Sequence, residues 1–489
     1  MDFLKILRKK EIYIKNWLKN KIIITTKKRK ELMDKAIIKN KEYIVDIIDN
    51  GIEGEGIAKI DNFTIFIPGA IKGEKLKIII VKVLTSYAYG KILEIIEKSD
   101  RRIEVDCSTY KRCGGCNLRH IDYDETLEIK QNIVQNLVDK SLKTKLKVNK
   151  TIGMGNPYHY RNKLQYPVGI DRNGNSTIGV FANRSHEIIN MEKCFIQNES
   201  AEMIAKFIFN YWVENNLAIY NENTKQGLLR HIVVKVGIRT NEYMLILVIN
   251  GNKFKKEMDF IKVVTQKFPQ IKTIIKNINT KNTNVILGEV NDCIYGDGYI
   301  TDILGDYTFK ISPHSFYQVN PVQAELLYNI GIEAAELSKE DVVFDLYCGI
   351  GTISIFMASF CKKVYGIEIV KESIDMANEN ANLNNISNIE FFAGDVEVVL
   401  NELINVKNII PDVIMIDPPR KGLDSVSIDN ILKILPAKVI YISCNPATLI
   451  RDLSFFEKHY CISSIQPVDM FPWTSHVECV SVLNLKKTV

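Results

Sequence analysis

The last third of the chain alternates short apolar runs with longer amphipathic stretches. The apolar runs have strand length, and the stretches between them have helical spacing. The predicted strands are 341–347, 364–368, 389–392, 412–416, 438–443 and 479–484, and the predicted helices are 352–361, 371–383, 396–407, 426–435 and 447–458. This alternation predicts a doubly wound α/β sheet with helices on both faces, which binds ligands at the carboxyl ends of its strands.

Two further regions precede this one. Residues 42–98 consist of short β-rich runs separated by glycine-containing turns such as GIEGEG, which predicts a small barrel of a kind that often binds oligonucleotides. A barrel with a purely structural role is an open alternative. Residues 150–310 mix β-like runs with a few helical stretches and predict a mixed α+β region. The predicted domains are 1–41, 42–99, 100–315 and 316–489.

The size and composition of the chain narrow its class. With 489 residues the chain is too long for one hydrophobic core, and 46% hydrophobic and 25% charged residues are typical of a globular protein. No apolar run approaches the roughly 18 residues that a membrane span requires. We therefore expect a cytoplasmic protein with no membrane partner and no obligate protein partner. Its ten cysteines then serve as metal ligands, nucleophiles or packing residues rather than as disulfides.

The net charge of +6 is unevenly distributed along the chain. Residues 1–40 carry thirteen Lys and Arg against four Asp and Glu, and they include the run KKRK at 27–30. A basic arm of this kind attracts a phosphate backbone. A solvated extension that aids solubility explains the same charges, and the sequence leaves both interpretations open.

The predicted sheet carries the features of a nucleoside site. The segment DLYCGIGT at 345–352 contains Gly349, which lets backbone approach a ligand at the start of a helix. Glu368 ends the second predicted strand, where a carboxylate can bind both hydroxyls of a ribose. Asp395 follows the third strand, near the expected adenine, and Asp417 follows the fourth. The lack of a third glycine disfavours NAD, and the arrangement resembles that of S-adenosylmethionine-dependent methyltransferases. A dehydrogenase-like or structural domain is the alternative.

Cys444 lies at the end of the predicted strand 438–443, in the segment YISCNP. Carbon-5 of a pyrimidine is a poor nucleophile until a thiolate adds to carbon-6, and a base must later remove the carbon-5 proton. This chemistry requires one cysteine and one base at the same cleft. Glu478, at the start of the last predicted strand, is a candidate base. Considered alone, Cys444 is better explained as a packing residue, because a free cysteine packs like a small hydrophobic side chain.

Five segments in order carry a more specific resemblance. SPHSFYQVN (312–320), DLYCGIGT, DPPRKG, SCNP and HVE resemble the RNA uracil-5 methyltransferase family, and the resemblance runs from about residue 42 to the end. It implies that Cys444 is the nucleophile and Glu478 the proton-abstracting base. It also implies a TRAM-type RNA-binding barrel at 42–98, and a piece near 120–150 that packs with the catalytic domain. The positions that match the family's cofactor contacts are Gln318, Tyr347, Glu368 and Asp417.

Three cysteines are closely spaced in the segment DCSTYKRCGGCNLRH, with a C-x5-C-x2-C pattern, and a fourth lies in MEKCF. These four are Cys107, Cys113, Cys116 and Cys194. Four thiolates suit either tetrahedral zinc or a cubane cluster, and the spacing alone leaves both open. The family resemblance implies a [4Fe–4S] cluster. Because methyl transfer requires no electron, we expect the cluster to help folding or RNA positioning.

The sequence therefore predicts an RNA methyltransferase that makes 5-methyluridine. A TRAM barrel together with an iron–sulfur cluster resembles the family members that act on 23S ribosomal RNA. A tRNA uridine-C5 methyltransferase is one alternative. An amino-methyltransferase acting on adenine or guanine nitrogen, or an RNA-binding iron–sulfur protein without activity, would leave Cys444 and Glu478 without a task.

Overall fold

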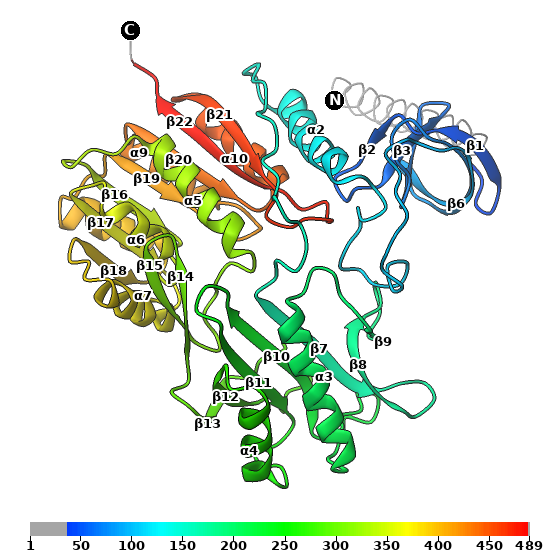
Figure 1. Cartoon of the computed structure of the whole chain (residues 1–489). Helices are drawn as coiled ribbons and strands as arrows, with labels where there is room; N and C mark the ends of the chain where they lie inside the picture. Colours follow the sequence, from blue (N-terminus) through cyan, green and yellow to red (C-terminus); the bar gives the residue numbers. More distant parts are fainter. Residues whose placement is uncertain (1–36, 488–489) are drawn as a thin grey trace, which may run out of the picture. The chain divides into compact units, whose positions relative to one another are not determined.

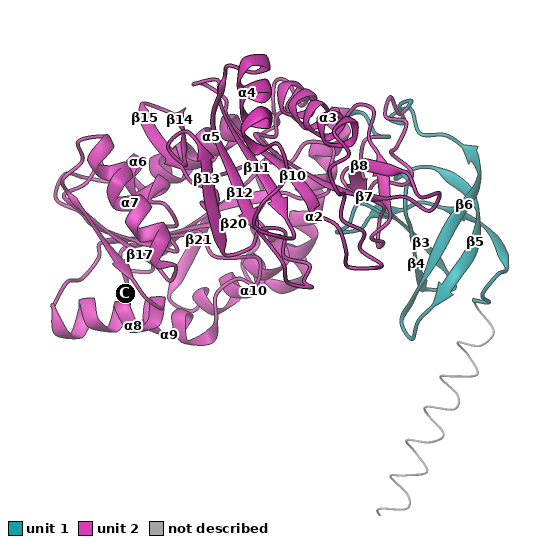
Figure 2. Cartoon of the chain, turned by 90° about the horizontal axis from the view of Figure 1, so that it is seen from below, with its two compact units in different colours: residues 1–104, 120–122 teal, residues 105–119, 123–489 magenta. Residues whose placement is uncertain are grey.

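The computed structural model describes residues 37–487, which divide into two units (Figure 2). The first unit comprises the described residues up to Glu104 together with His120–Asp122. The second comprises Val105–Arg119 and the chain from Tyr123 onward. Most of the basic arm predicted at 1–41 lies outside the described residues.

The β-branched runs near the start of the chain form a six-stranded sheet in the order β1-β5-β6-β4-β3-β2. Its strands are β1 (Glu42–Asp46), β2 (Asp49–Asn50), β3 (Gly56–Ile60), β4 (Phe63–Ile67), β5 (Lys75–Val83) and β6 (Tyr87–Glu97). Alternate residues such as Ile65, Ile78 and Ile80 point inward and are fully buried. Arg102 donates to the buried carboxylate of Glu74 at 2.6 and 2.7 Å, which fixes the end of this unit.

A seven-stranded sheet in the second unit has the order β13-β12-β11-β10-β7-β8-β9. Its strands are β7 (Lys163–Ile170), β8 (Ser176–Phe181), β9 (Ile188–Asn190), β10 (Leu229–Gly237), β11 (Glu242–Ile249), β12 (Ile271–Ile278) and β13 (Val290–Tyr295). Helices α3 (Glu199–Glu214) and α4 (Glu257–Lys267) cover one face of it (Figure 1). The hairpin of β14 (Ile300–Leu304) and β15 (Tyr307–Ile311) follows.

The central strands β10 and β11 are apolar on both faces, which explains their nearly continuous hydrophobic sequence. Val234 and Leu245 belong to the core beneath α3 and α4. Val233 and Ile246 point the other way and belong to a core that also contains residues of the C-terminal sheet. The central sheet and the C-terminal sheet therefore share buried side chains within the second unit.

The C-terminal sheet confirms the predicted α/β architecture, with strand order β18-β17-β16-β19-β20-β22-β21. The strands are β16 (Val342–Leu346), β17 (Lys363–Glu368), β18 (Ile389–Ala393), β19 (Val413–Ile416), β20 (Lys438–Ser443), β21 (Tyr460–Val468) and β22 (Glu478–Leu485). The first five pair in parallel, and β22 runs antiparallel to both β20 and β21. Strand β21 was not predicted from the sequence pattern, because it lies at the sheet edge and contains Pro467, a residue that disfavours central strands.

Helices cover both faces of this sheet (Figure 1). They are α2 (Tyr123–Ser141), α5 (Pro321–Ala335), α6 (Thr352–Ala358), α7 (Lys371–Leu383), α8 (Val396–Asn401), α9 (Ser425–Ile434) and α10 (Pro446–Phe456). Helix α8 is shorter than predicted, because its last turn widens into a π-helix at Glu402–Val406. Val134 and Val138 of α2 pack into the same core as Leu449 and Leu453 of α10, which confirms that the 120–150 piece joins the C-terminal sheet.

Helix α2 also fixes the connection between β21 and β22, residues 469–477. Lys130 forms a fully buried ion pair with Asp469, and Tyr123 donates to the same carboxylate at 2.8 Å. A buried carboxylate is costly unless it is paired in this way. The start of the 469–477 segment is therefore held in place by a helix from a distant part of the chain.

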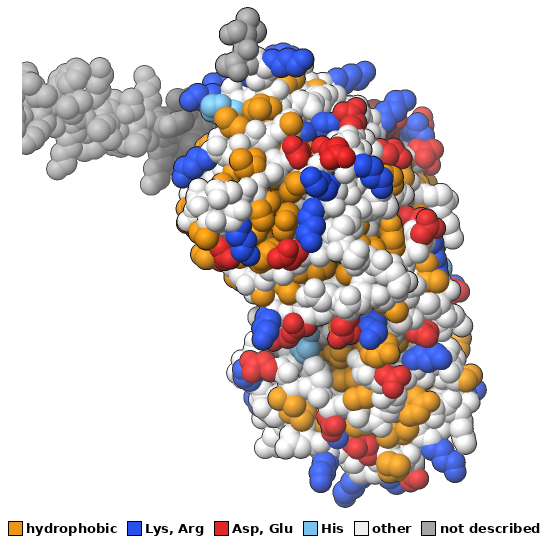
Figure 3. Space-filling model, turned by 90° about the vertical axis from the view of Figure 1, so that its left-hand side faces the viewer, with side chains coloured by type: hydrophobic (Ala, Val, Ile, Leu, Met, Phe, Trp, Pro, Cys, Tyr) orange, Lys and Arg blue, Asp and Glu red, His pale blue; other side chains and the backbone are white. Residues whose placement is uncertain are grey.

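The described residues contain no helix with the length and apolar character of a membrane span. Figure 3 shows one face of the molecule, on which Lys and Arg are interspersed with Asp and Glu. The strong basic excess found in the sequence belongs to residues 1–40, nearly all of which lie outside the described part of the chain.

Candidate active site

The pairing of β22 with β20 brings the two candidate reactive residues together. In this antiparallel register Ser443 pairs with Cys479, so that Cys444 and Glu478, one residue further, lie across from each other. Cys444 is a free, half-buried cysteine, whereas Glu478 is only 3% exposed. The structure therefore places the predicted nucleophile and the predicted base at one end of the sheet.

Asp417 comes to the same edge because β19 and β20 are neighbouring parallel strands. The turn that follows it, DPPRKG, is held by Asp452, whose carboxylate accepts from the Leu423 amide at 2.8 Å and from the Tyr441 hydroxyl at 2.7 Å. Gly422 has a φ of 74°, in the left-handed region that favours glycine. The backbone carbonyl of Arg420 accepts from the Asn445 side chain at 3.1 Å, tying this turn to the residue after Cys444.

The electrostatics of this edge are dominated by buried acids. Burial, and then the nearby Asp417, raise the pKa of Glu478, while Arg420 opposes this shift. Burial likewise raises the pKa of Asp417. The pKa of Cys444 is raised to about 11 by burial and by the negative charges of Glu478 and Asp417, against the opposing effect of Arg420. The free protein thus holds the thiol protonated, beside a carboxyl group with raised proton affinity.

Gln318 is fixed near these acids from two sides. Its backbone carbonyl accepts from the Asn162 side chain at 2.9 Å, and its side chain hydrogen-bonds to the hydroxyl of Tyr328 on α5. Tyr328 is buried, and the charges of Asp417 and Glu478 are close enough to raise its pKa. Tyr328 therefore lies between the predicted cofactor contact Gln318 and the acidic residues Asp417 and Glu478.

The remaining cofactor candidates lie around the ends of β16 and β17. Glu368 accepts from the backbone amides of Val370 at 3.0 Å and Gly349 at 3.3 Å. A side chain added at Gly349 would meet no atom within 4 Å, so there is open space beside this turn. Tyr347 has a φ of 67°, which is rare for a bulky residue, and its hydroxyl hydrogen-bonds to Ser427 of α9. The half-buried ring of Tyr347 is thus held at the end of β16.

Asp395 has a structural task in this arrangement. It is the N-cap of α8, and its side chain accepts from the Glu397 amide at 2.9 Å. It is also exposed, although its charge acts on Tyr347. One carboxylate oxygen is therefore committed to the helix, and the other is available to a ligand.

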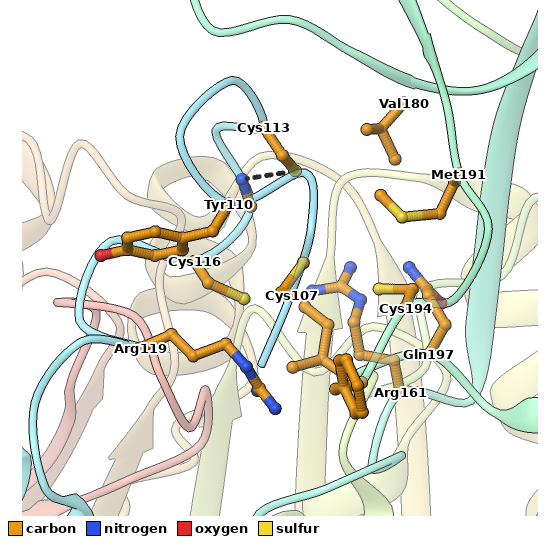
Figure 4. A pocket seen from close by; sticks show the side chains of 13 residues that line it. Cys107, Tyr110, Cys113, Cys116, Arg119, Arg161, Val180, Met191, Cys194 and Gln197 are labelled. Atoms are coloured by element: carbon orange, nitrogen blue, oxygen red, sulfur yellow. Dashed lines mark hydrogen bonds between the residues drawn. The ribbon is translucent and has the colours of Figure 1, made fainter. Parts of the chain in front are cut away.

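The four predicted metal ligands surround a second site in the same unit. Cys107, Cys113, Cys116 and Cys194 line a cavity of about 230 Å³, and all four are free thiols (Figure 4). Within residues 37–487 no group of three or more His, Cys, Asp or Glu side chains is arranged to hold a metal ion. The four thiols border the cavity rather than converge on one point.

The wall of this cavity also contains polar atoms that lack partners. Among the described residues, Nη1 of Arg119, Nε of Arg161 and Oε1 of Gln197 are buried without a hydrogen bond. Such atoms are costly to leave unsatisfied. The cavity thus combines four thiols with two guanidinium groups, a donor set that suits an anionic group bound by thiolates.

Several residues that shape these sites were not predicted from the sequence. Tyr328, Asn162 and Asp452 act through partners that are distant in sequence, so no local spacing marks them. Arg420 lies within the DPPRKG motif, and its positive charge close to Asp417 in the sequence could have marked it as a site residue.

Comparison with known proteins assigns the family. Residues 295–487 match the family model described as tRNA (uracil-5-)-methyltransferase, and residues 39–93 match the TRAM domain. A protein of Clostridium acetobutylicum named "uncharacterized RNA methyltransferase" is 46% identical over 91% of this chain and 97% of its own length. The chain belongs to the RNA uracil-5 methyltransferase family. A Clostridium tetani protein with the same name is 44% identical over 92% of this chain and 98% of its own.

The fold of this methyltransferase also has a solved counterpart. The Pyrococcus abyssi tRNA (uracil-54, C5)-methyltransferase in complex with S-adenosyl-L-homocysteine superposes with a TM-score of 0.72, covering 91% of this chain and 100% of that one. At 23% identity this likeness shows the fold. The family model and the relatives confirm the predicted family and enzyme class, and the solved structure and the TRAM match confirm the α/β fold with a small N-terminal β domain. The protein is an S-adenosylmethionine-dependent RNA (uracil-5) methyltransferase.

The raised pKa of Cys444 leads to a direct test. Because only the thiolate reacts, we expect alkylation of Cys444 by iodoacetamide to accelerate steadily from about pH 7 to about pH 10, as followed by peptide mass spectrometry. Glu478→Gln removes a negative neighbour and should speed alkylation at a given pH, whereas Arg420→Ala should slow it. The exposed Cys461 in the same digest controls for the reagent. A rate that levels off below about pH 8 would show that the thiol is not held protonated.

Proposed function

We propose that this enzyme methylates carbon-5 of uridine in 23S ribosomal RNA through a covalent bond between Cys444 and carbon-6 of the uracil, with Glu478 removing the carbon-5 proton. The observation that carries this proposal is the register of β20 and β22, which sets Cys444 across from Glu478. An amino-methyltransferase needs neither a thiol nor a base at this position. A catalytically inactive protein would have no reason to keep both beside Asp417.

The chemistry uses these residues in order. Cys444 loses its proton to solvent, and its sulfur forms a bond to carbon-6, which moves an electron pair toward carbon-5. Carbon-5 then accepts an electrophilic methyl group, which bound S-adenosylmethionine would supply, with the methyl–sulfur bond breaking and the sulfur leaving as a neutral thioether. Glu478 then takes the carbon-5 proton, the ring double bond reforms, and the bond from carbon-6 to sulfur breaks. A carboxylate with raised pKa is suited to this last step, because it binds the proton more strongly than an ordinary glutamate does.

The chain's own groups fit the cofactor. The residues that we propose for its binding are Gln318, Tyr347, Gly349, Glu368, Asp395 and Asp417. The carboxylate of Glu368 accepts two backbone amides and retains lone pairs for ribose hydroxyls. Gln318 can both donate and accept, which suits the zwitterionic methionine end of the cofactor. The open space beside Gly349 adjoins Glu368, which accepts from the Gly349 amide, and it leaves room for a nucleoside there.

We propose that the four cysteines hold a [4Fe–4S] cluster. A single zinc ion would draw all four sulfurs to about 2.3 Å from one point, whereas these thiols border a cavity of about 230 Å³. Thiolate ligands give such a cluster a negative overall charge, which Arg161 would offset, together in part with Arg119, whose guanidinium is already paired with Asp106. The cluster would then organise the chain around it, since uridine methylation transfers no electrons.

The choice of 23S ribosomal RNA rests on the combination of a TRAM barrel with this cysteine set. We assign residues 42–99 to the barrel, 100–315 to the α+β domain with the cysteines, and 316–489 to the methyltransferase domain, preceded by the basic arm 1–41. The TRAM match at 39–93 supports the first boundary of this division, and the family match at 295–487 begins within the last part of the α+β domain. A transfer RNA substrate is the second candidate, because the solved structure with the same fold is a tRNA enzyme. Either substrate implies a cytoplasmic enzyme.

The product and the substrate are tested together by nucleoside mass spectrometry. We expect label from S-adenosylmethionine to appear in 5-methyluridine when the protein, kept free of oxygen, is incubated with unmodified ribosomal RNA. Cys444→Ala should lower this label by at least about 10³-fold, because the carbon-6 adduct no longer forms. Label in transfer RNA would select the second candidate. Label in methylated adenine or guanine, or full activity in Cys444→Ala, would contradict the covalent mechanism.

Glu478 acts only after methyl transfer in this scheme, which gives its replacement a distinct signature. We expect Glu478→Gln to form the methylated adduct but to release it slowly, so that a protein–RNA species that resists denaturation accumulates on gels. Gln cannot accept the proton, yet it retains the shape of the buried side chain. The double variant Cys444→Ala/Glu478→Gln is the control and should form no such species. Absence of the adduct in Glu478→Gln, in a wild-type preparation that is active, would remove Glu478 from its proposed role.

Iron analysis tests the cluster. Protein purified without oxygen should contain about four iron and four sulfide ions per chain, with the broad visible absorption of an iron–sulfur protein. Cys194→Ser should lose most of the iron, whereas Cys293→Ser, a change at an exposed cysteine outside the cavity, should retain it. If the purified protein contains zinc instead of iron, the four cysteines hold a single metal ion and the proposed cluster is wrong.

A further inference from the structure

The position of Glu478 depends on the 469–477 segment that leads into it. This segment connects β21 to β22 and has turns but no helix or strand of its own. Its first half is attached to helices, since Gln323 of α5 donates to the Asp469 carbonyl at 3.1 Å and Asn320 donates to the Met470 carbonyl at 3.1 Å. The second half, next to Glu478, needs another support.

The segment also contains an unfavourable backbone conformation. Trp473 has a φ of 68°, which is rare for a large aromatic residue and persists only where the surroundings enforce it. Its indole nitrogen donates to the Pro157 carbonyl at 3.0 Å, and the guanidinium of Arg119 lies 5.0 Å from its ring. The segment would therefore relax into another shape if these contacts were lost.

The support for the second half comes from the cysteine loop, which we define as residues 107–119. The Asn117 side chain donates to the Ser475 hydroxyl at 2.9 Å, and the Ser475 amide donates to the Asn117 side-chain oxygen at 2.8 Å. The Leu118 amide adds a bond to the Trp473 carbonyl at 3.0 Å. Ser475 is buried, so this reciprocal pair is shielded from water.

The place of this pair in the chain connects the two sites. Asn117 follows Cys116 directly, and Ser475 precedes Glu478 by three residues. The Tyr110 hydroxyl donates to the Asn117 carbonyl at 3.0 Å, which fixes the backbone of Asn117 within the cysteine loop. The Asn117 side chain, in the cysteine loop, therefore holds in place the segment that leads into Glu478.

We propose that Asn117 is a positioning residue for Glu478, acting through Ser475, and that the cysteine loop thereby supports the proton-removal step. The proposal rests on the proposed role of Glu478. A base must lie within hydrogen-bond reach of the proton that it takes, and a shift of about 1 Å can cost on the order of 10²-fold in rate. Attack by Cys444 and methyl transfer require no contact with Asn117. Loosening the segment therefore slows release of the adduct and leaves its formation largely intact.

The test assays three variants on the same RNA substrate, namely the RNA that becomes labelled in the nucleoside assay. Asn117→Ala removes both hydrogen bonds of the pair, and Ser475→Ala removes one of them. Arg112→Ala is the matched control, because it removes an exposed ion pair to Glu187 from the same loop. We expect Asn117→Ala to lower turnover about 10- to 100-fold and to accumulate the denaturation-resistant adduct. Ser475→Ala should do the same to a smaller degree, since its backbone bond remains. Arg112→Ala should match the wild type.

Two further measurements separate this role from a purely structural one. The double variant Asn117→Ala/Ser475→Ala should be no worse than Asn117→Ala alone, as expected for residues that act as one pair. Iron content in Asn117→Ala should equal that of the wild type. If Asn117→Ala lowers the amounts of adduct and product together, or if it loses iron, the positioning role is wrong. A wild-type protein that makes no 5-methyluridine would instead defeat the proposed function.

Discussion

The antiparallel direction of β22 is the constraint that brings Cys444 and Glu478 to the same edge of the sheet. Strands β16 to β20 run parallel, so each presents its last residue, or the one after it, at the carboxyl edge. A parallel neighbour would also present its last residue there. Because β22 is antiparallel to β20, its first residue, Glu478, reaches this edge instead. The segment that connects β21 to β22 lies at the same edge for the same reason, which brings it within reach of α2, α5 and the cysteine loop.

A cluster of acidic side chains is the second property of this edge. Asp345, Asp417 and Glu478 all have raised pKa values, with burial as the first cause, and each lies near another acid. Buried carboxylates without enough positive charge are unfavourable. Arg420 offsets only part of the cost, since it is exposed. Because a sulfonium cofactor carries positive charge, its binding at the proposed site beside Asp417 would relieve this repulsion.

The sequence was sufficient for the parts of the fold that local patterns specify. Parallel strands buried on both faces are nearly continuous apolar runs, and residues such as Cys444 and Asp417 stand out where those runs end. The edge strand β21 has no such signature, because polar residues and Pro467 interrupt it. Contacts made by Tyr328 or Asn117 follow from tertiary packing. Asn117 and Ser475 are 358 residues apart, and neither motif around them indicates that they meet.

A contact across that distance in sequence explains why an iron–sulfur cluster would be useful to an enzyme that moves no electrons. The cysteine loop has turns but neither helix nor strand among its residues, so little of its own backbone hydrogen bonding holds its shape. Fixing a loop costs on the order of 1–2 kcal/mol per residue in conformational entropy. In the cluster that we propose, four thiolates, three of them from the loop and one from beyond β9, would supply that constraint covalently. A loop made rigid in this way can hold Asn117 against Ser475, which a free loop of the same sequence would do only part of the time.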